Sequence, residues 1–249
     1  MTEQDKTFPI AVNNLTRLYG SGANSVTALD GVTYEFPRGS FTAIMGPSGS
    51  GKSTFLQCAA GLDRPTSGTV TIEGKDISNL TEASLTILRR QKIGFIFQAF
   101  NLLPALTAAQ NVSLPLRLAK LPTNKKQVED VLRMVGLAER AGHHPGELSG
   151  GQQQRVAIAR ALVTNPAVLF ADEPTGALDR ASSRAVLELL QSLAASKEHT
   201  IVMVTHDPIA ASYADRVIFI ADGKIVSQLE QSTPTHIATR MTELEAAKV

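Results

Sequence analysis

The chain has 249 residues, 43% of them apolar, which is enough for a substantial buried core. Its formal net charge is +1 and charges of both signs are interspersed, so nothing indicates a nucleic-acid-binding surface. The single cysteine, Cys58, excludes an intramolecular disulfide bond. No apolar run approaches the length of a membrane span and the first residues lack a signal-peptide profile, so we expect a soluble protein.

Short β-type segments dominate the N-terminal part of the chain. We expect strands at Ile10–Leu18, Val32–Phe36 and Thr69–Glu73, and a buried strand at Phe41–Met45 because that segment is mostly apolar. Tyr19 follows the first strand, where its ring is either an ordinary surface side chain or a platform on which an adenine stacks. Composition alone does not distinguish these two roles.

The most informative stretch lies between the buried strand and an apolar helix predicted from Phe55 onward. It has glycines at its first and sixth positions followed by Lys-Ser, the phosphate-loop pattern G-x-x-x-x-G-K-[ST]. In such a loop, backbone amides at a helix N-terminus face the phosphates, the lysine reaches the outer phosphates and the serine hydroxyl holds Mg²⁺. A glycine- and serine-rich turn without a ligand is the alternative. The residues of the loop are Gly46, Pro47, Ser48, Gly49, Ser50, Gly51, Lys52, Ser53 and Thr54.

The sequence changes in character after the next strand. A helix is predicted from Thr81, and the strand Ile93–Phe97 follows it with Gln98 at its exit. Apolar residues with helical spacing then predict a helix before Gly136. We expect a helical insertion rather than more sheet, broken into short pieces by Pro104, Pro115 and Pro122.

Two further strands in the last part of the chain end in polar residues. Leu148–Gln152 opens a helix that is expected to reach about residue 164, and the apolar run Ala167–Ala171 leads into Asp172 and Glu173. A solvated acidic turn is the alternative for this acidic pair. After a helix at about 180–196, the apolar strand Ile201–Val204 leads into Thr205 and His206. Residues 217–226 predict a hairpin, and 231–249 predict a marginal helix to which we assign no chemistry.

These strand ends are expected to converge on one nucleotide, because the carboxyl ends of parallel strands share one edge of a sheet. Phosphoryl transfer to water needs Mg²⁺, charge neutralisation and an oriented water molecule. Asp172 suits the Mg²⁺ shell, Glu173 can polarise the water and His206 can donate to the γ-phosphate. Gln98 can bridge the metal and the water. The predicted catalytic residues are therefore Lys52, Gln98, Glu173 and His206, and the predicted metal ligands are Ser53, Gln98 and Asp172.

Taken together, these motifs resemble the nucleotide-binding subunit of an ABC transporter. The phosphate loop, Gln98, the Leu-Ser-Gly-Gly-Gln signature, the acidic strand, Ala177-Leu178-Asp179 and His206 occur in the expected order, from about Ile10 to Ser227. The segments 100–104, 111–116 and 171–179 are similar to a narrower branch, which holds the lipoprotein-release, macrolide-export and cell-division-type ATPases. The resemblance implies an α/β P-loop NTPase fold with a mainly parallel core sheet, an N-terminal antiparallel β part and an inserted helical subdomain.

The resemblance also implies ATP and Mg²⁺ as ligands, and a homodimer in which each nucleotide lies between two chains. Tyr19 would stack on the adenine, and Asp179 would contact the partner chain. The signature residues Ser149, Gly150, Gly151 and Gln152 would face the partner's nucleotide. ATP hydrolysis would power a membrane transport or mechanotransmission complex, of the export or lipoprotein- and peptide-handling type. A separate transmembrane permease subunit would hold the protein at the cytoplasmic face of the membrane. The implied division is a single ABC ATPase domain over 1–249, with core residues at about 1–89 and 166–230, a helical subdomain at about 90–165 and a tail at 231–249.

Other uses of the same ATPase domain are the alternatives. Relatives in DNA maintenance carry long coiled coils, and no sustained heptads occur here. Translation-factor relatives carry two such domains in one chain. An ATPase of iron–sulfur assembly is a third possibility, against which only the resemblance of residues 101–116 argues. The transported substrate and the identity of the membrane subunit are not encoded in any motif of this sequence.

Overall fold

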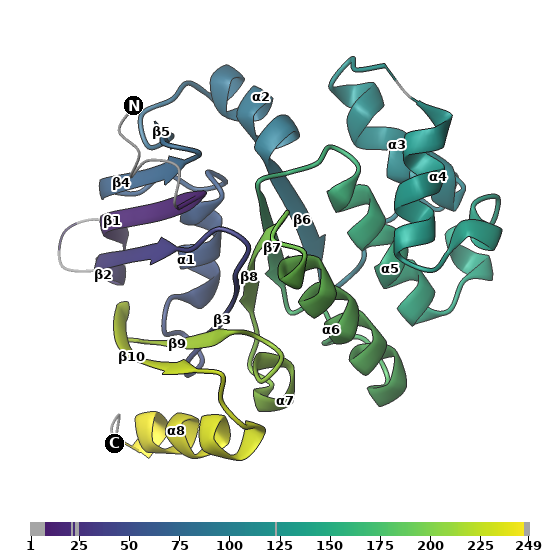
Figure 1. Cartoon of the computed structure of the whole chain (residues 1–249). Coiled ribbons are helices and arrows are strands. Elements are labelled where there is room, and N and C mark those ends of the chain that lie inside the picture. The colour runs from purple at the N-terminus through teal and green to yellow at the C-terminus, as the bar shows by residue number, and fades with distance from the viewer. Residues whose placement is uncertain (1–7, 21, 23–24, 123, 247–249) are drawn as a thin grey trace.

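The structure, a computed structural model, describes residues 8–20, 22, 25–122 and 124–246. At its centre is a six-stranded sheet in the order β10-β9-β3-β8-β7-β6 (Figure 1). The neighbours from β9 to β6 pair in parallel and only β10 pairs antiparallel, at one edge. The strands are β3 (Phe41–Met45), β6 (Ile93–Phe97), β7 (Val168–Asp172), β8 (Thr200–Val204), β9 (Arg216–Ala221) and β10 (Lys224–Glu230).

Both faces of this sheet are buried, which is why its central strands are apolar at almost every position. In β7, Leu169 and Ala171 pack on the side of the helical insertion, whereas Val168 and Phe170 pack on the opposite side. Successive residues of a strand point to opposite faces, so the sheet separates two hydrophobic cores. The predicted parallel core sheet is confirmed.

The second sheet is antiparallel and has the order β2-β1-β4-β5, and it covers one of these cores. Helix α1 (Lys52–Ala59), which leaves the phosphate loop, lies between the two sheets and contacts strands of both (Figure 1). Cys58 is buried on this helix, and burial raises the pKa of its thiol to about 12. The strands are β1 (Ile10–Tyr19), β2 (Val26–Phe36), β4 (Ser67–Ile72) and β5 (Lys75–Asp76). The N-terminal antiparallel part is therefore confirmed, with β2 longer than predicted.

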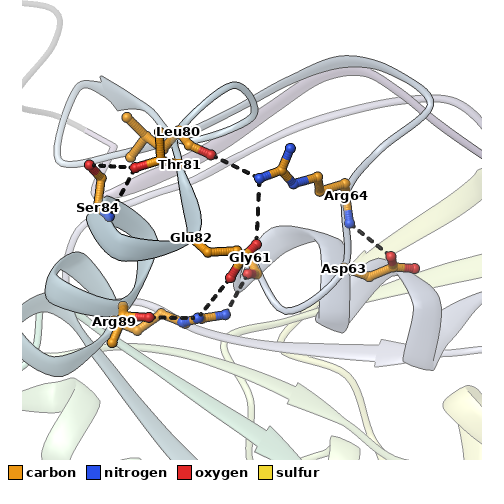
Figure 2. A network of polar contacts seen from close by, with 9 residues as sticks. Gly61, Asp63, Arg64, Leu80, Thr81, Glu82, Ser84 and Arg89 are labelled. Carbon is orange, nitrogen blue, oxygen red and sulfur yellow. Dashed lines mark hydrogen bonds and ion pairs between the residues drawn. The ribbon is translucent and has the colours of Figure 1, made fainter.

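Helix α2 (Glu82–Lys92) begins at the predicted residue, with the Thr81 side chain accepting a hydrogen bond from the Ser84 amide. Figure 2 shows how α2 is fastened to the chain that follows α1. Arg89 donates to the carbonyl oxygen of Gly61 over 2.8 Å, and Arg64 donates to the carbonyl oxygen of Leu80 over 3.2 Å. These contacts join both ends of α2 to the turn that follows α1.

The helical insertion contains α3 (Ala108–Leu118), α4 (Lys125–Met134), short 3₁₀ turns at Ala138–Arg140 and Pro145–Glu147, and α5 (Gly150–Leu162). Pro115 does not break the chain as predicted, but lies inside α3. An interior proline removes one helical hydrogen bond. Here the Thr107–Gln110 capping box and the burial of Val112 and Leu116 offset that loss. Strand β6, inside the expected helical range of 90–165, belongs to the central sheet, so the helical part starts after Phe97.

The C-terminal part adds α6 (Arg180–Ala195), the short helix α7 (Pro208–Ala211) and α8 (Pro234–Ala246). The expected tail helix thus forms, and α8 lies beside α7 with Ile237 fully buried (Figure 1). Residues 247–249 of the predicted tail lie outside the described residues. In the part of the chain that the structure describes, no helix is both long and apolar enough to cross a membrane.

Candidate active site

The phosphate loop joins β3 to α1, as predicted. Gly51 precedes the first residue of α1 with φ 104°, and a Cβ there would lie 2.3 Å from the Ala28 carbonyl oxygen, so no other residue fits. The Lys52 ammonium donates to the carbonyl oxygens of Gly46 and Pro47, each over 2.8 Å. The lysine therefore already lies across the loop, where a phosphate would replace its carbonyl partners.

Glu173 and His206 form a pair at the ends of the neighbouring strands β7 and β8. His206 Nδ1 lies 2.8 Å from Glu173 Oε1, and the Thr205 hydroxyl donates to the other carboxylate oxygen over 3.5 Å. The Glu173 side chain is 20% exposed, whereas that of His206 is 74% exposed. The carboxylate is thus held in a fixed position while the imidazole remains accessible to a ligand.

Asp172 ends β7 directly before this pair. Burial raises the pKa of its carboxyl group, and the negative charge of Glu173 raises it further. Among the described residues, no group hydrogen-bonds to the Asp172 carboxylate or forms an ion pair with it. A half-buried carboxylate without a partner suits a cation that neutralises it, and Mg²⁺ prefers such oxygen ligands. The residues present therefore fit the expected metal.

Gln98 lies against the loop that carries Glu173. A Cβ added to Gly176 would lie 2.7 Å from the Gln98 side-chain nitrogen, so the amide packs directly on that glycine. The loop is tight, because the Gly176 amide donates to the Glu173 carbonyl oxygen over 3.0 Å and Glu173 has φ 48°. The structure thus brings Gln98, Asp172, Glu173 and His206 to one edge of the sheet.

The signature residues stand at the start of α5. The exposed Ser149 caps this helix: its hydroxyl accepts from the Gln152 amide and the Gln152 side chain accepts from the Ser149 amide. The amides of Gly150 and Gly151 take no part in this capping box. Among the described residues, no hydrogen bond joins Ser149 to the phosphate loop. The buried residues of α1 belong to the core on one face of the central sheet and those of α5 to the core on the other face. The two predicted anion sites therefore begin helices on opposite faces of the sheet.

Asp179 caps α6 in the same way. Its carboxylate accepts from the amides of Ala181 and Ser182 and from the Ser182 hydroxyl, and the bonds from Ser182 lower the pKa of this carboxyl group. The side chain is exposed. In the single chain, the role of Asp179 is to begin a helix.

Tyr19 is held by two residues that the sequence analysis did not single out. Its hydroxyl donates to Asp63 over 2.7 Å, and the Arg17 guanidinium lies 4.5 Å from the ring centre while pairing with the same carboxylate. The tyrosine is 38% exposed, so part of its ring remains free to be covered. Residues two apart in a strand point to the same face, so the spacing of Arg17 and Tyr19 in β1 could have indicated their contact.

Gln154 was also missed. It is fully buried on α5 and donates to the carbonyl oxygens of Phe97 and Pro174, which flank Gln98 and Glu173 in the sequence. A signal was present, because Gln154 shares one helix face with the buried residues Ile158 and Ala161. A polar residue on an apolar face needs partners.

Comparisons with known proteins agree with this geometry. The model of the ABC transporter family matches residues 29–176. The macrolide export ATP-binding/permease protein MacB of Hyphomonas neptunium is 50% identical over 220 residues, covering 88% of this chain and 34% of that protein. The bacitracin export ATP-binding protein BceA of Halalkalibacterium halodurans is 43% identical over 224 residues, covering 89% of this chain and 88% of that protein. The chain thus spans about one third of the length of the macrolide-export relatives.

A solved structure has the same fold. The dimeric ATP-binding cassette MJ0796, in a post-hydrolysis state bound to ADP and Pi, has a TM-score of 0.80 and 42% sequence identity. It covers 90% of this chain and 99% of its own.

Proposed function

This chain belongs to the ABC transporter family, and on that premise we propose that it binds and hydrolyses ATP to power a membrane transport complex. The observation that carries the proposal is the convergence at one sheet edge. The phosphate loop, the half-buried Asp172 and the Glu173–His206 pair all lie at the ends of neighbouring parallel strands. Such an edge is where open α/β sheets bind their ligands.

The phosphate-binding part follows from the loop geometry. Lys52 would exchange its two carbonyl partners for the outer phosphates, and the loop amides would face the others. Tyr19 would stack on the adenine with the part of its ring that remains exposed. Mg²⁺, held by Ser53, Gln98 and Asp172, would neutralise charge on the phosphates.

Hydrolysis needs a base that positions the attacking water. Glu173 is proposed for this role because its carboxylate is held by His206 and Thr205 and because its loop packs against Gln98 at Gly176. The exposed imidazole of His206 would remain accessible to the γ-phosphate while Nδ1 faces Glu173. Ser149 and Asp179 are proposed to act across a head-to-tail homodimer, since α5 and α1 pack on opposite faces of the central sheet within one chain.

The membrane partner is proposed from the names of the relatives. One is an ATP-binding/permease protein and another an export ATP-binding protein, which supports a separate permease here and an export-type cycle at the cytoplasmic membrane face. The inserted helices α3 and α4 are only 11 and 10 residues long, so nothing favours the coiled-coil relatives of DNA maintenance.

The test uses Glu173→Gln, which keeps the side-chain shape but removes the charge that polarises water. We expect ATP hydrolysis to fall by about 100-fold or more while ATP binding persists, as for loss of a general base. Size-exclusion chromatography with Mg-ATP should then show a dimer. A purified wild-type chain without Mg-dependent ATPase activity, or a variant that remains monomeric when saturated with ATP, contradicts the proposal.

The membrane partner is tested separately. The tagged chain should co-purify with a permease from detergent-solubilised membranes of its own cell, and the partner should be identified by mass spectrometry. Recovery of the tagged chain from the aqueous fraction without any membrane protein argues against the transport role. It does not bear on the proposed ATPase activity.

A further inference from the structure

One buried amide joins the two segments that carry the proposed catalytic residues. The Gln154 side chain is 0% exposed, and its nitrogen donates to the Pro174 carbonyl oxygen over 2.6 Å and to the Phe97 carbonyl oxygen over 3.3 Å. Phe97 directly precedes Gln98, and Pro174 directly follows Glu173. Both protons of one amide group are therefore used to hold two strand ends side by side.

The other end of this amide has no partner. Gln154 Oε1 is buried without a hydrogen bond among the described residues. A buried oxygen without a donor reduces stability. Turning the amide over would place this oxygen against two carbonyl oxygens, so the acceptors fix its orientation. The glutamine therefore holds the two carbonyl groups side by side, although its own side-chain oxygen is left without a hydrogen bond among the described residues.

A second contact from the same helix supports this reading. Arg160, also on α5, donates to the carbonyl oxygens of Phe100 and Asn101, which have φ values of 59° and 53°. Left-handed backbone at two successive non-glycine residues is strained and needs support from its surroundings. Helix α5 thus holds the chain on both sides of Gln98, and at Pro174 it also holds the loop of the general base.

We propose that Gln154 is a positioning residue for ATP hydrolysis, which sets the distance between the Gln98 segment and the Glu173 carboxylate. The inference rests on the proposed ATPase function. Because α5 begins at the signature residue Ser149, the helix that would face the partner's nucleotide also fixes the general base. We expect its effect on the chemical step, since both hydrogen bonds of Gln154 go to strand ends and none joins it to the phosphate loop or Tyr19 in the part of the chain that the structure describes.

The test replaces Gln154 with methionine, which has a similar volume and no amide. We expect kcat for ATP hydrolysis to fall by about 10- to 100-fold, as for a small misplacement of catalytic groups, and KM for ATP to stay within about twofold. The matched control is Gln127→Met. Gln127 likewise donates to a backbone carbonyl oxygen, that of Val163 over 2.7 Å, but Val163 lies at the C-terminal end of α5 and adjoins no proposed catalytic residue in the sequence. The Gln127→Met variant should leave kcat unchanged.

A second measurement separates positioning from general damage. In the Glu173→Gln background, Gln154→Met should lower the residual rate no further, because the base through which it acts is already lost. Should the methionine variant fail to fold, Gln154→Asn keeps an amide that is too short to reach both carbonyl groups, and the same loss of kcat is expected.

The opposite results overturn the inference. A folded variant with wild-type kcat, a raised KM with normal kcat, or a fully additive loss in the Glu173→Gln background each contradicts it. Absence of hydrolysis by the wild-type chain instead contradicts the proposed function, and the inference with it.

Discussion

The Tyr19 ring is restrained by neighbours that leave only part of its surface free for a base. Asp63 accepts from the tyrosine hydroxyl and pairs with Arg17, whose guanidinium lies over the ring. Asp63 also accepts from the Arg64 amide, at the edge of the network in Figure 2. The orientation of the proposed adenine platform thus depends on the turn that follows α1.

This arrangement gives a prediction for nucleotide affinity. Tyr19→Ala should raise the Kd for ATP by roughly 5-fold or more, the scale of a lost base–aromatic stack. Arg17→Ala should raise it by about two- to fivefold, because the ring remains but is less restrained. Neither change should alter kcat at saturating ATP. Calorimetric titration of ATP into the two variants, each in the Glu173→Gln background, measures both Kd values without turnover.

The control is Arg38→Ala, since Arg38 likewise pairs with a carboxylate, that of Glu73 over 2.7 Å, although its side chain is more exposed than that of Arg17. Surface ion pairs contribute little to stability, so all three proteins should remain folded. An equal loss of affinity in the Arg38 variant would show that Tyr19 is not specifically supported by Arg17.

At the scale of elements, the loop between Gln98 and α3 depends on one asparagine. Asn111 is 0% exposed, and its amide nitrogen donates to the carbonyl oxygens of Leu103, Leu106 and Thr107. Its side-chain oxygen accepts from the Leu103 amide over 2.8 Å. A single side chain thus satisfies the backbone of a loop that has no regular structure.

Asn111→Ala should therefore destabilise the protein. Leaving buried backbone groups unpaired costs about 1–3 kcal/mol. For a chain of this size, such a loss lowers Tm by roughly 2–12 °C. Differential scanning calorimetry measures the shift. Ser113→Ala, which removes one bond to the Gln110 carbonyl oxygen in the same helix, should cost less than half as much. Similar shifts in the two variants would contradict this role of Asn111.

The sequence predicted these elements unevenly, for physical reasons. The strands of the central sheet were predictable because burial on both faces makes each of them a short apolar run, as in Ala167–Ala171. Helix α3 was not, because Pro115 reads locally as a break and the packing that tolerates it comes from distant residues. Local pattern and tertiary context disagree there, and the context decides.

The same distinction applies to the site. Residues that directly follow strands, such as Glu173 and His206, could be predicted because the end of a parallel strand fixes where a side chain goes. The burial of Gln154 could be predicted from its helix face, but the partners of Gln154 and Asp63 could not, because these backbone and side-chain groups are brought near only by the fold. Long-range polar contacts leave almost no local pattern in a sequence.

At the scale of the whole molecule, one chain carries two separate helix N-termini at which phosphate binding is proposed. One follows Gly51 in the phosphate loop, and the other follows Ser149 at the start of α5. One triphosphate can use both only if two chains pair head to tail, and a twofold dimer then contains two equivalent sites. The related cassette structure is a dimer, which supports this arrangement.

The last prediction tests whether Ser149 acts across the dimer. One chain carries Lys52→Ala and a second carries Ser149→Arg, both in the Glu173→Gln background. Each homodimer has a lesion in both sites and should retain almost no ATP. If sites form between chains, the mixed dimer has one doubly damaged site and one intact site. Filter binding of radiolabelled Mg-ATP should then approach one nucleotide per mixed dimer.

If each site instead lay within one chain, both sites of the mixed dimer would remain damaged and retention would not exceed that of either homodimer. Strict coupling between the two sites would give the same low value, so a crosslinking measurement separates these two cases. The only native cysteine, Cys58, is buried, which leaves engineered thiols as the reactive ones. In the Glu173→Gln chain with Ser48→Cys and Ser149→Cys, an ATP-dependent disulfide between subunits requires the signature of one chain to lie over the phosphate loop of the other. A disulfide found only within single chains would rule that arrangement out.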